Sequence, residues 1–74
     1  MTQLIVDFRV GTSEDHARAA ITRNGGMVKR KMRSDDPTRI RLLATFESEA
    51  NVAKIGKEIS VERTEVDGEN FRAS

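Results

Sequence analysis

The stretch LIVDFRV, residues 4–10, decides the fold because its side chains alternate with a period of two. This period is typical of a strand with one face on an apolar core. The stretch RIRLLATF, residues 39–46, repeats the pattern and predicts another strand. The inward side chains would be Leu4, Val6, Phe8, Val10, Ile40, Leu42, Ala44 and Phe46. Because these two stretches are the most apolar, we expect them at the centre of a sheet.

Capping and turn residues define the elements between these strands. Thr12 or Ser13 would begin a helix by accepting hydrogen bonds from its first free amides, and the Gly25-Gly26 pair would end it. Residues 27–33 predict a strand with Lys29, Lys31 and Arg33 outward. Ser-Asp-Asp-Pro at 34–37 is typical of a turn, so residues 27–46 predict a hairpin.

The last third of the chain predicts another helix and strand. Ser48 would cap a helix over residues 49–59, with Val52, Ile55 and Ile59 in an inward stripe. Residues 61–67 predict a strand with Thr64 and Val66 inward.

The order β-α-β-β-α-β predicts an α+β, ferredoxin-like fold. Right-handed crossovers would place both helices on one face of a four-stranded antiparallel sheet in the order 4-1-3-2. The predicted domain spans residues 1–68, with a flexible C-terminal tail over residues 69–74. The sheet face without helices would be solvated or would dock a partner.

Composition limits the classes of protein to which the chain can belong. The 74 residues suffice for one domain, and the absence of cysteine excludes disulfides and thiolate metal sites. No apolar run approaches the roughly 18 to 20 residues of a membrane span, so no membrane partner is expected. No export signal is visible, which favours a cytoplasmic location, although a fragment of an exported protein would look the same.

The residues needed for catalysis are scarce. His16 is the sole histidine, and we expect it at the exposed start of a helix. A catalytic histidine needs a nucleophile beside it and a third group that orients it, and this position makes such an arrangement improbable. Asp35 and Asp36 lie in a turn without calcium-ligand spacing. The sequence therefore predicts a protein that is not an enzyme and holds no metal or cofactor.

Basic residues gather in the predicted hairpin although the net charge is only +1. A nucleic-acid-binding module would use phosphate contacts from Lys29, Lys31, Arg33, Arg39 and Arg41. Single-stranded RNA readers of this topology also stack bases on aromatic rings of the sheet face. Phe8 and Phe46 have inward parity, so a solvated or protein-docking face ranks ahead of nucleic-acid binding.

Several segments, in their order and spacing, resemble the subtilisin propeptide-like inhibitor family of stand-alone inhibitors and intramolecular chaperones of subtilisin-type serine proteases. The resemblance spans most of the chain and rests on LIVDF, TSED, GGMVKR, ATF, VAKIGKEI and SVERTEVDG. It implies a protein-binding module that inhibits without catalytic groups. The open sheet face would dock on surface helices of the protease, and the tail would lie in its cleft.

The resemblance also implies which residues bind the protease. Glu65 and Asp67 would cap helix N-termini of the protease, where carboxylates meet free amides and a favourable dipole. With Ser74 just before the scissile bond, Phe71 would fill an apolar pocket, and a slip of one residue would place Asn70 there instead. The tail residues that bind the protease would be Phe71, Arg72, Ala73 and Ser74. A third alternative is a regulatory ligand-binding domain that dimerises through its sheet.

Overall fold

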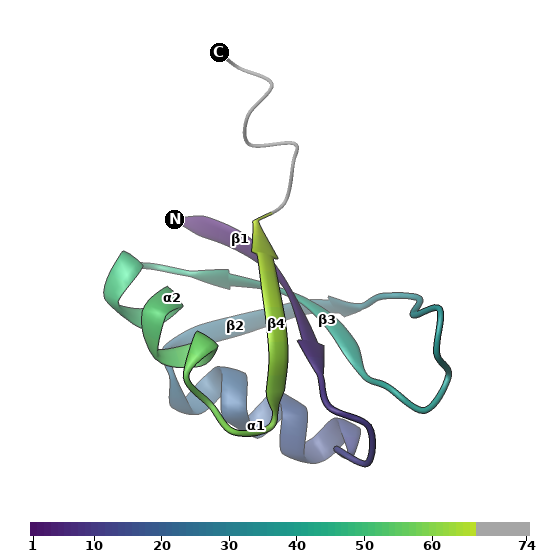
Figure 1. Ribbon diagram of the computed structural model, residues 1–74. Coiled ribbons are helices and arrows are strands. Elements are labelled where there is room, and N and C mark those ends of the chain that lie inside the picture. Colours follow the sequence, from purple (N-terminus) through teal and green to yellow (C-terminus); the bar gives the residue numbers. More distant parts are fainter. Residues whose placement is uncertain (67–74) are drawn as a thin grey trace.

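The computed structural model describes residues 1–66 and contains six elements in the order β-α-β-β-α-β (Figure 1). Their bounds are β1 (Thr2–Phe8), α1 (Glu14–Arg23), β2 (Gly26–Lys31), β3 (Arg41–Phe46), α2 (Glu49–Gly56) and β4 (Val61–Val66). Every predicted element is therefore present. The last residue of the strand predicted over 61–67, and the tail predicted over 69–74, lie outside the described residues.

The strands form one antiparallel sheet in the order β2-β3-β1-β4. This is the predicted order, read from the other edge. In the central pair, Leu4 of β1 lies opposite Ala44 of β3, and Val6 lies opposite Leu42. The predicted ferredoxin-like α+β fold is confirmed.

One apolar cluster joins the sheet to both helices. Residues that lie directly opposite each other in an antiparallel pair share a face, so the alternate residues of β1 and β3 pack on the same side. The buried members are Leu4, Val6, Phe8, Ala17, Ala20, Ile21, Leu42, Ala44, Phe46, Ile55 and Val61. Because α1 and α2 both contribute to this cluster, they cover one face of the sheet and leave the other face open (Figure 1).

The two serines that precede the helices act as N-caps. Ser13 Oγ accepts a hydrogen bond from the His16 amide at 3.1 Å, so Ser13 rather than Thr12 is the N-cap of α1. Ser48 Oγ accepts one from the Asn51 amide at 3.2 Å. Each hydroxyl satisfies an amide that has no partner within its helix.

Gly25 and Gly26 join α1 to β2 for two different steric reasons. Gly25 has a φ of +81°, a left-handed conformation that glycine adopts without strain. A side-chain carbon on Gly26 would collide with the ring of Phe46 and would lie 2.8 Å from Cγ2 of Ile21. The pair therefore ends α1, as predicted, and lets the start of β2 lie directly against the core.

The second helix is shorter than the helix predicted over residues 49–59. It ends at Gly56, and Ile59, predicted to join the inward stripe, is 88% exposed. The Lys57 amide donates to the Lys54 carbonyl and the Glu58 amide to the Ile55 carbonyl, which tightens the chain into a turn. A side-chain carbon at Gly56 would meet nothing within 4 Å, so this glycine does not mark a close helix contact.

The bounds of β1, β2 and β3 also differ from the predictions. Strand β1 ends at Phe8, and Val10, predicted inward, is 58% exposed. Strand β3 begins at Arg41, which leaves Arg39 in the loop that follows β2. Because β2 ends at Lys31, Arg33 also lies in that loop rather than in a strand. The apolar alternation continues past each strand end, but the backbone pairing that defines a strand stops earlier.

Glu58 links the turn after α2 to the end of α1. Its carboxylate accepts a hydrogen bond from Asn24 Nδ2 at 2.7 Å and from Arg23 Nη2 at 3.0 Å. The Asn24 amide group also donates to the Ala20 carbonyl at 2.8 Å. The hydrogen bond from Asn24, followed by that from Arg23, lowers the pKa of Glu58 below its ordinary value of 4.5.

Acid should weaken this link between the helices. Because the pKa of Glu58 is lower in the folded chain, the link stabilises the fold above about pH 4.5 and is lost as the pH falls below that value. We expect Glu58→Gln to reduce the difference between urea midpoints measured at about pH 6 and about pH 3. Glu47→Gln, an exposed carboxylate without an ion pair among residues 1–66, is the control and should leave the difference unchanged. Equal effects of both variants would contradict the assignment.

Truncation of a buried and of an exposed apolar side chain should change the free energy of unfolding by very different amounts. Phe46 is fully buried, so Phe46→Ala should lower the free energy of unfolding by about 3 kcal/mol or more. Ile59→Ala removes an exposed side chain and should change it by less than about 0.5 kcal/mol. Urea unfolding followed by circular dichroism measures both values, and similar losses would show that the core is placed incorrectly.

Candidate functional site

The open face of the sheet carries a group of three charged side chains on β1 and the two strands paired with it. Asp7 of β1 lies opposite Arg41 of β3 and Arg63 of β4. Its carboxylate is 3.2 Å from Arg41 Nε and 3.1 Å from Arg63 Nε. The Asp7 side chain is 13% exposed and that of Arg41 25%, whereas Arg63 is 68% exposed, so the shared carboxylate is shielded from water and Arg63 covers it from the solvent side. The hydrogen bond to Asp7, and the charge of Asp7, raise the pKa of Arg63.

Next to these charges, Leu43 forms a small apolar centre of the open face. It is 5% exposed although it does not belong to the core cluster. Its cross-strand neighbours are Ile5 of β1 and Arg30 of β2. The outward parity of Leu43 was predicted, but its burial was not, since it depends on neighbouring side chains that come from distant parts of the sequence.

Both edge strands contain a register shift that changes which side chains face outward. In β2, Val28 lies opposite Ala44, and Arg30, two residues on, lies opposite the adjacent Leu43, so Lys29 is the extra residue of a β-bulge. In β4, Val61 and Arg63 lie opposite the adjacent residues Phe8 and Asp7, which makes Glu62 the extra residue. Beyond each extra residue, the side chains of the edge strand lie on the opposite face from the one that simple alternation predicts.

The bulge in β2 corrects the predicted basic face. Lys31 lies opposite Leu42, whose side chain is in the core, and its Nζ is 3.3 Å from Glu14 Oε1 of α1. Lys31 therefore belongs to the helix side of the sheet, and its predicted outward position is wrong. The ion pairs with Arg18 and Lys31 lower the pKa of Glu14, with the hydrogen bond from Arg18 as the larger cause.

Arg39 connects the loop after β2 to the edge strand β4. Its Nη1 donates to Glu62 Oε2 at 2.6 Å, and its Nε is 3.6 Å from Asp36 Oδ2. Asp36 in turn accepts hydrogen bonds from the Thr38 hydroxyl at 2.6 Å and the Thr38 amide at 2.9 Å. These two hydrogen bonds are the main causes that lower the pKa of Asp36, and they confirm its predicted turn role.

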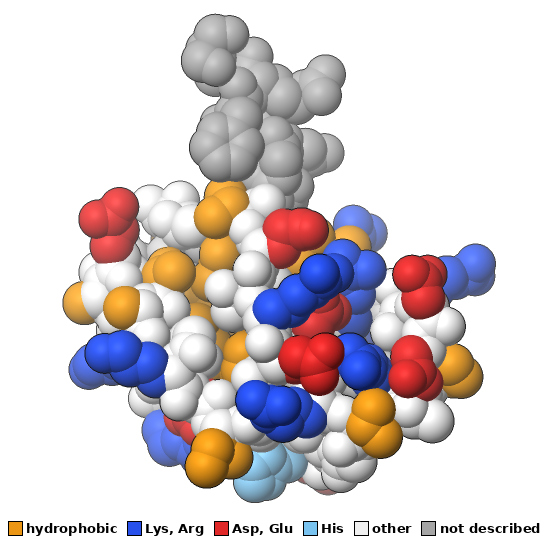
Figure 2. Space-filling model, in the orientation of Figure 1, with side chains coloured by type: hydrophobic (Ala, Val, Ile, Leu, Met, Phe, Trp, Pro, Cys, Tyr) orange, Lys and Arg blue, Asp and Glu red, His pale blue; other side chains and the backbone are white. Residues whose placement is uncertain are grey.

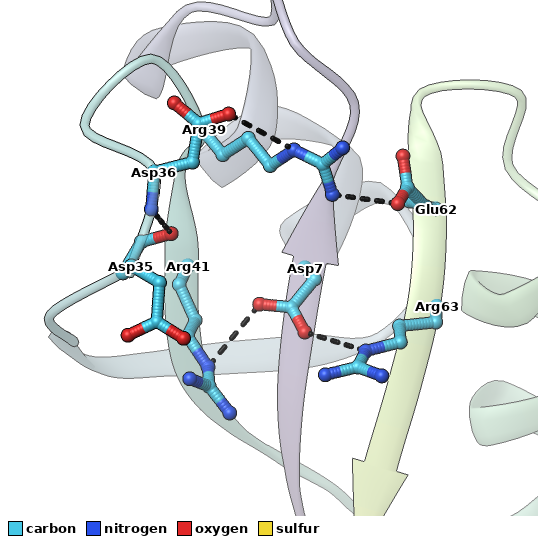
Figure 3. A pocket seen from close by; sticks show the side chains of 8 residues that line it. Asp7, Asp35, Asp36, Arg39, Arg41, Glu62 and Arg63 are labelled. Carbon is cyan, nitrogen blue, oxygen red and sulfur yellow. Dashed lines mark hydrogen bonds and ion pairs between the residues drawn. The ribbon is translucent and has the colours of Figure 1, made fainter.

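A hollow of about 380 Å³ lies between this loop, the open face and β4. Figure 3 shows Asp7 between Arg41 and Arg63, with Arg39 reaching across from Asp36 toward Glu62. Its charged lining residues are Asp7, Asp35, Asp36, Glu62, Arg39, Arg41 and Arg63. We call this site the charged hollow.

The predicted basic residues do not form one continuous surface. Arg41 pairs with Asp7, Arg39 with Glu62, and Lys31 with Glu14 on the helix side. Figure 2 shows acidic and basic side chains interspersed on the visible face. Lys29 and Arg33 are exposed without an ion pair in the described part of the chain.

The predicted protease-binding residues fall partly within the described structure. Glu65 is exposed on β4 opposite Ile5, and it makes no ion pair within residues 1–66. Asp67, Phe71, Arg72, Ala73 and Ser74 lie outside the described residues. The open-face parity predicted for Glu65 is confirmed by its register.

Sequence reasoning did not pair Asp7 with its arginines or identify Glu62 and Asp36 as partners of Arg39. One signal was present, because Asp7 is the one charged residue of β1 and shares its parity with Arg41 and Arg63. The link from Arg39 to Glu62 had no such signal, since it depends on the bulge in β4.

Within residues 1–66, no group of three or more histidine, aspartate or glutamate side chains is placed to hold a metal ion. None of the described helices is long and apolar enough to cross a membrane. No protein-family model matches the chain, and a search of curated proteins found no match either.

The ion pairs of Asp7 should contribute more to the free energy of unfolding than an exposed ion pair does. Asp7→Asn removes a shielded carboxylate and leaves the guanidinium group of Arg41, which is 25% exposed, without its partner, so we expect a loss of about 1–2 kcal/mol in the free energy of unfolding. Glu14→Gln, which breaks exposed pairs on α1, should cost clearly less. Urea unfolding at low and high salt measures both. A loss for Asp7→Asn no larger than the control would show that the central pair is not structural.

Proposed function

We propose that the chain is a protein-binding module, an inhibitor or propeptide-like chaperone of a subtilisin-type serine protease. The open sheet face would dock on the protease, and the C-terminal residues would enter its cleft. One observation carries the proposal: on the sheet face that the helices leave open, the central charges are paired with one another beside Leu43 and Ile5. Such a face suits contact with another protein surface.

The pairing of charges favours a protein partner over a nucleic acid. A phosphate backbone is bound by cations that release counterions, and three of the five basic residues predicted for that role, Lys31, Arg39 and Arg41, pair with carboxylates of the chain itself. The described aromatic side chains, Phe8 and Phe46, are both buried in the core. They offer no stacking surface to bases.

Glu65 supports the docking mode. Its carboxylate is exposed on the edge strand, and it makes no hydrogen bond or ion pair with another described residue. A carboxylate in this position can accept hydrogen bonds from the free amides at a helix N-terminus of the partner. The proposed role uses binding alone, so it needs no catalytic group from this chain.

The purified chain should inhibit a generic subtilisin. Deletion of Asn70 to Ser74 should leave the thermal midpoint nearly unchanged and weaken inhibition greatly, because the proposed cleft-binding residues are lost while residues 1–66 remain. Phe71→Ala should weaken binding by about 2 kcal/mol, as for a buried aromatic anchor, and Arg72→Ala should matter less. Inhibition constants and thermal midpoints are the measurements.

Surface variants give the control. Glu65→Gln should weaken inhibition, whereas Glu49→Gln, on the opposite side of the sheet in α2, should not. The proposal fails if the intact chain does not inhibit subtilisin-type enzymes or if the shortened chain inhibits equally well. Salt-sensitive submicromolar binding to RNA at physiological ionic strength would favour the nucleic-acid alternative instead.

A further inference from the structure

One row of side chains crosses the whole open face and carries opposite charges at its two ends. Arg30 of β2 lies opposite Leu43 of β3. Leu43 lies opposite Ile5 of β1, which in turn lies opposite Glu65 of β4. Residues directly opposite each other in an antiparallel pair share a face, so all four side chains belong to the open side. We call these four residues the central row.

The two end charges of the central row are available to a partner. Arg30 and Glu65 are exposed, and neither makes a hydrogen bond or an ion pair with another of residues 1–66. They are three strand spacings apart, about 14 Å, which is too far for them to pair with each other. Arg63, two residues before Glu65 on the same strand, already donates to Asp7.

We propose that a second copy of this chain docks on the open face, related by a two-fold axis that runs between β1 and β3 and parallel to them. Rotation about this axis turns the two open faces toward each other and exchanges the ends of the central row. Arg30 of each copy then faces Glu65 of the other. A two-fold interface needs a surface that is complementary to itself in this way. The inference goes beyond the proposed function and does not depend on it.

Charge selects this axis over one that runs across the strands. An axis along the central row would place Arg30 over Arg30 of the second copy, and Glu65 over Glu65. Like charges that meet across an interface are unfavourable. The axis parallel to the strands instead brings Arg41 of one copy above Asp7 of the other, because these two residues lie opposite each other on β3 and β1. Opposite charges thus meet in two neighbouring rows.

The dimer should be weak and sensitive to salt. Sheets that pack face to face lie about 10 Å apart, a gap that the long side chains of Arg30 and Glu65 can close from opposite sides. Four strands of six or seven residues offer roughly 400 Å² per copy, at the small end of protein interfaces. Leu43 is 5% exposed, so apolar contact adds little, and the exposed charges that decide the arrangement are screened by salt.

Two charge reversals, made separately and then mixed, test the arrangement. Sedimentation equilibrium of the full chain at low ionic strength should show monomers and dimers, with fewer dimers in high salt. Arg30→Glu and Glu65→Arg should each weaken self-association by about tenfold, because two attractive contacts in each dimer become repulsive. An equimolar mixture of the two variants should restore the dimer, since each variant then presents the charge that the other lacks.

A third variant controls for net charge. Lys54→Glu changes the net charge as Arg30→Glu does, but it lies in α2 on the covered side of the sheet and should leave the dissociation constant of the dimer unchanged. Arg30 and Glu65 are exposed, so their variants should fold, which thermal unfolding checks. The proposal is wrong if the chain stays monomeric at millimolar concentration, if the single variants associate as the intact chain does, or if their mixture associates no better than either alone.

The outcome is separable from that of the protease assay. A dimer that does not inhibit subtilisin would reject the protease and leave the self-association standing. Inhibition by a chain that stays monomeric would reject the dimer alone. Where both occur, the dimer covers the face that docks on the protease, so excess subtilisin should convert dimers into one-to-one complexes.

Discussion

The antiparallel pairing of β1 with β3 is the constraint on which the rest of the structure depends. Its register places Val6 opposite Leu42 on one face and Asp7 opposite Arg41 on the other. A slip of one residue would exchange the faces, burying the aspartate beneath the helices and exposing the core. The same register thus defines the core and brings Arg41 to Asp7, to which the pairing of β1 with β4 adds Arg63.

Regular elements were predictable because their causes are local. Alternation in residues 4–8 and 41–46, the serines before each helix and the Gly25-Gly26 pair act over a few residues, and the sheet order follows from general rules of chain connection. The second helix was predicted too long because the periodicity of residues 52–59 says nothing of the contact between Glu58 and Asn24, which holds the following turn.

The candidate site was less predictable because it depends on irregular backbone. Parity alone placed Lys31 outward, but the extra residue at Lys29 returns it to the helix side. The extra residue at Glu62 likewise gives Arg39 an acceptor on β4. Neither insertion has a marker in the sequence, so counting charges overstated how basic the open face is. Pairing between segments distant in sequence converts an apparent cationic surface into a nearly balanced one.

The two β-bulges have a consequence for how molecules of this protein behave toward one another. They lie in β2 and β4, the outer strands of the sheet. An outer strand exposes backbone groups that a second chain can extend into a continuous sheet, and such growth leads to aggregation. An inserted residue interrupts the even spacing of those groups and bends the strand away. The irregular edge strands thus discourage self-polymerisation, while the open face of the sheet stays uncovered by the helices.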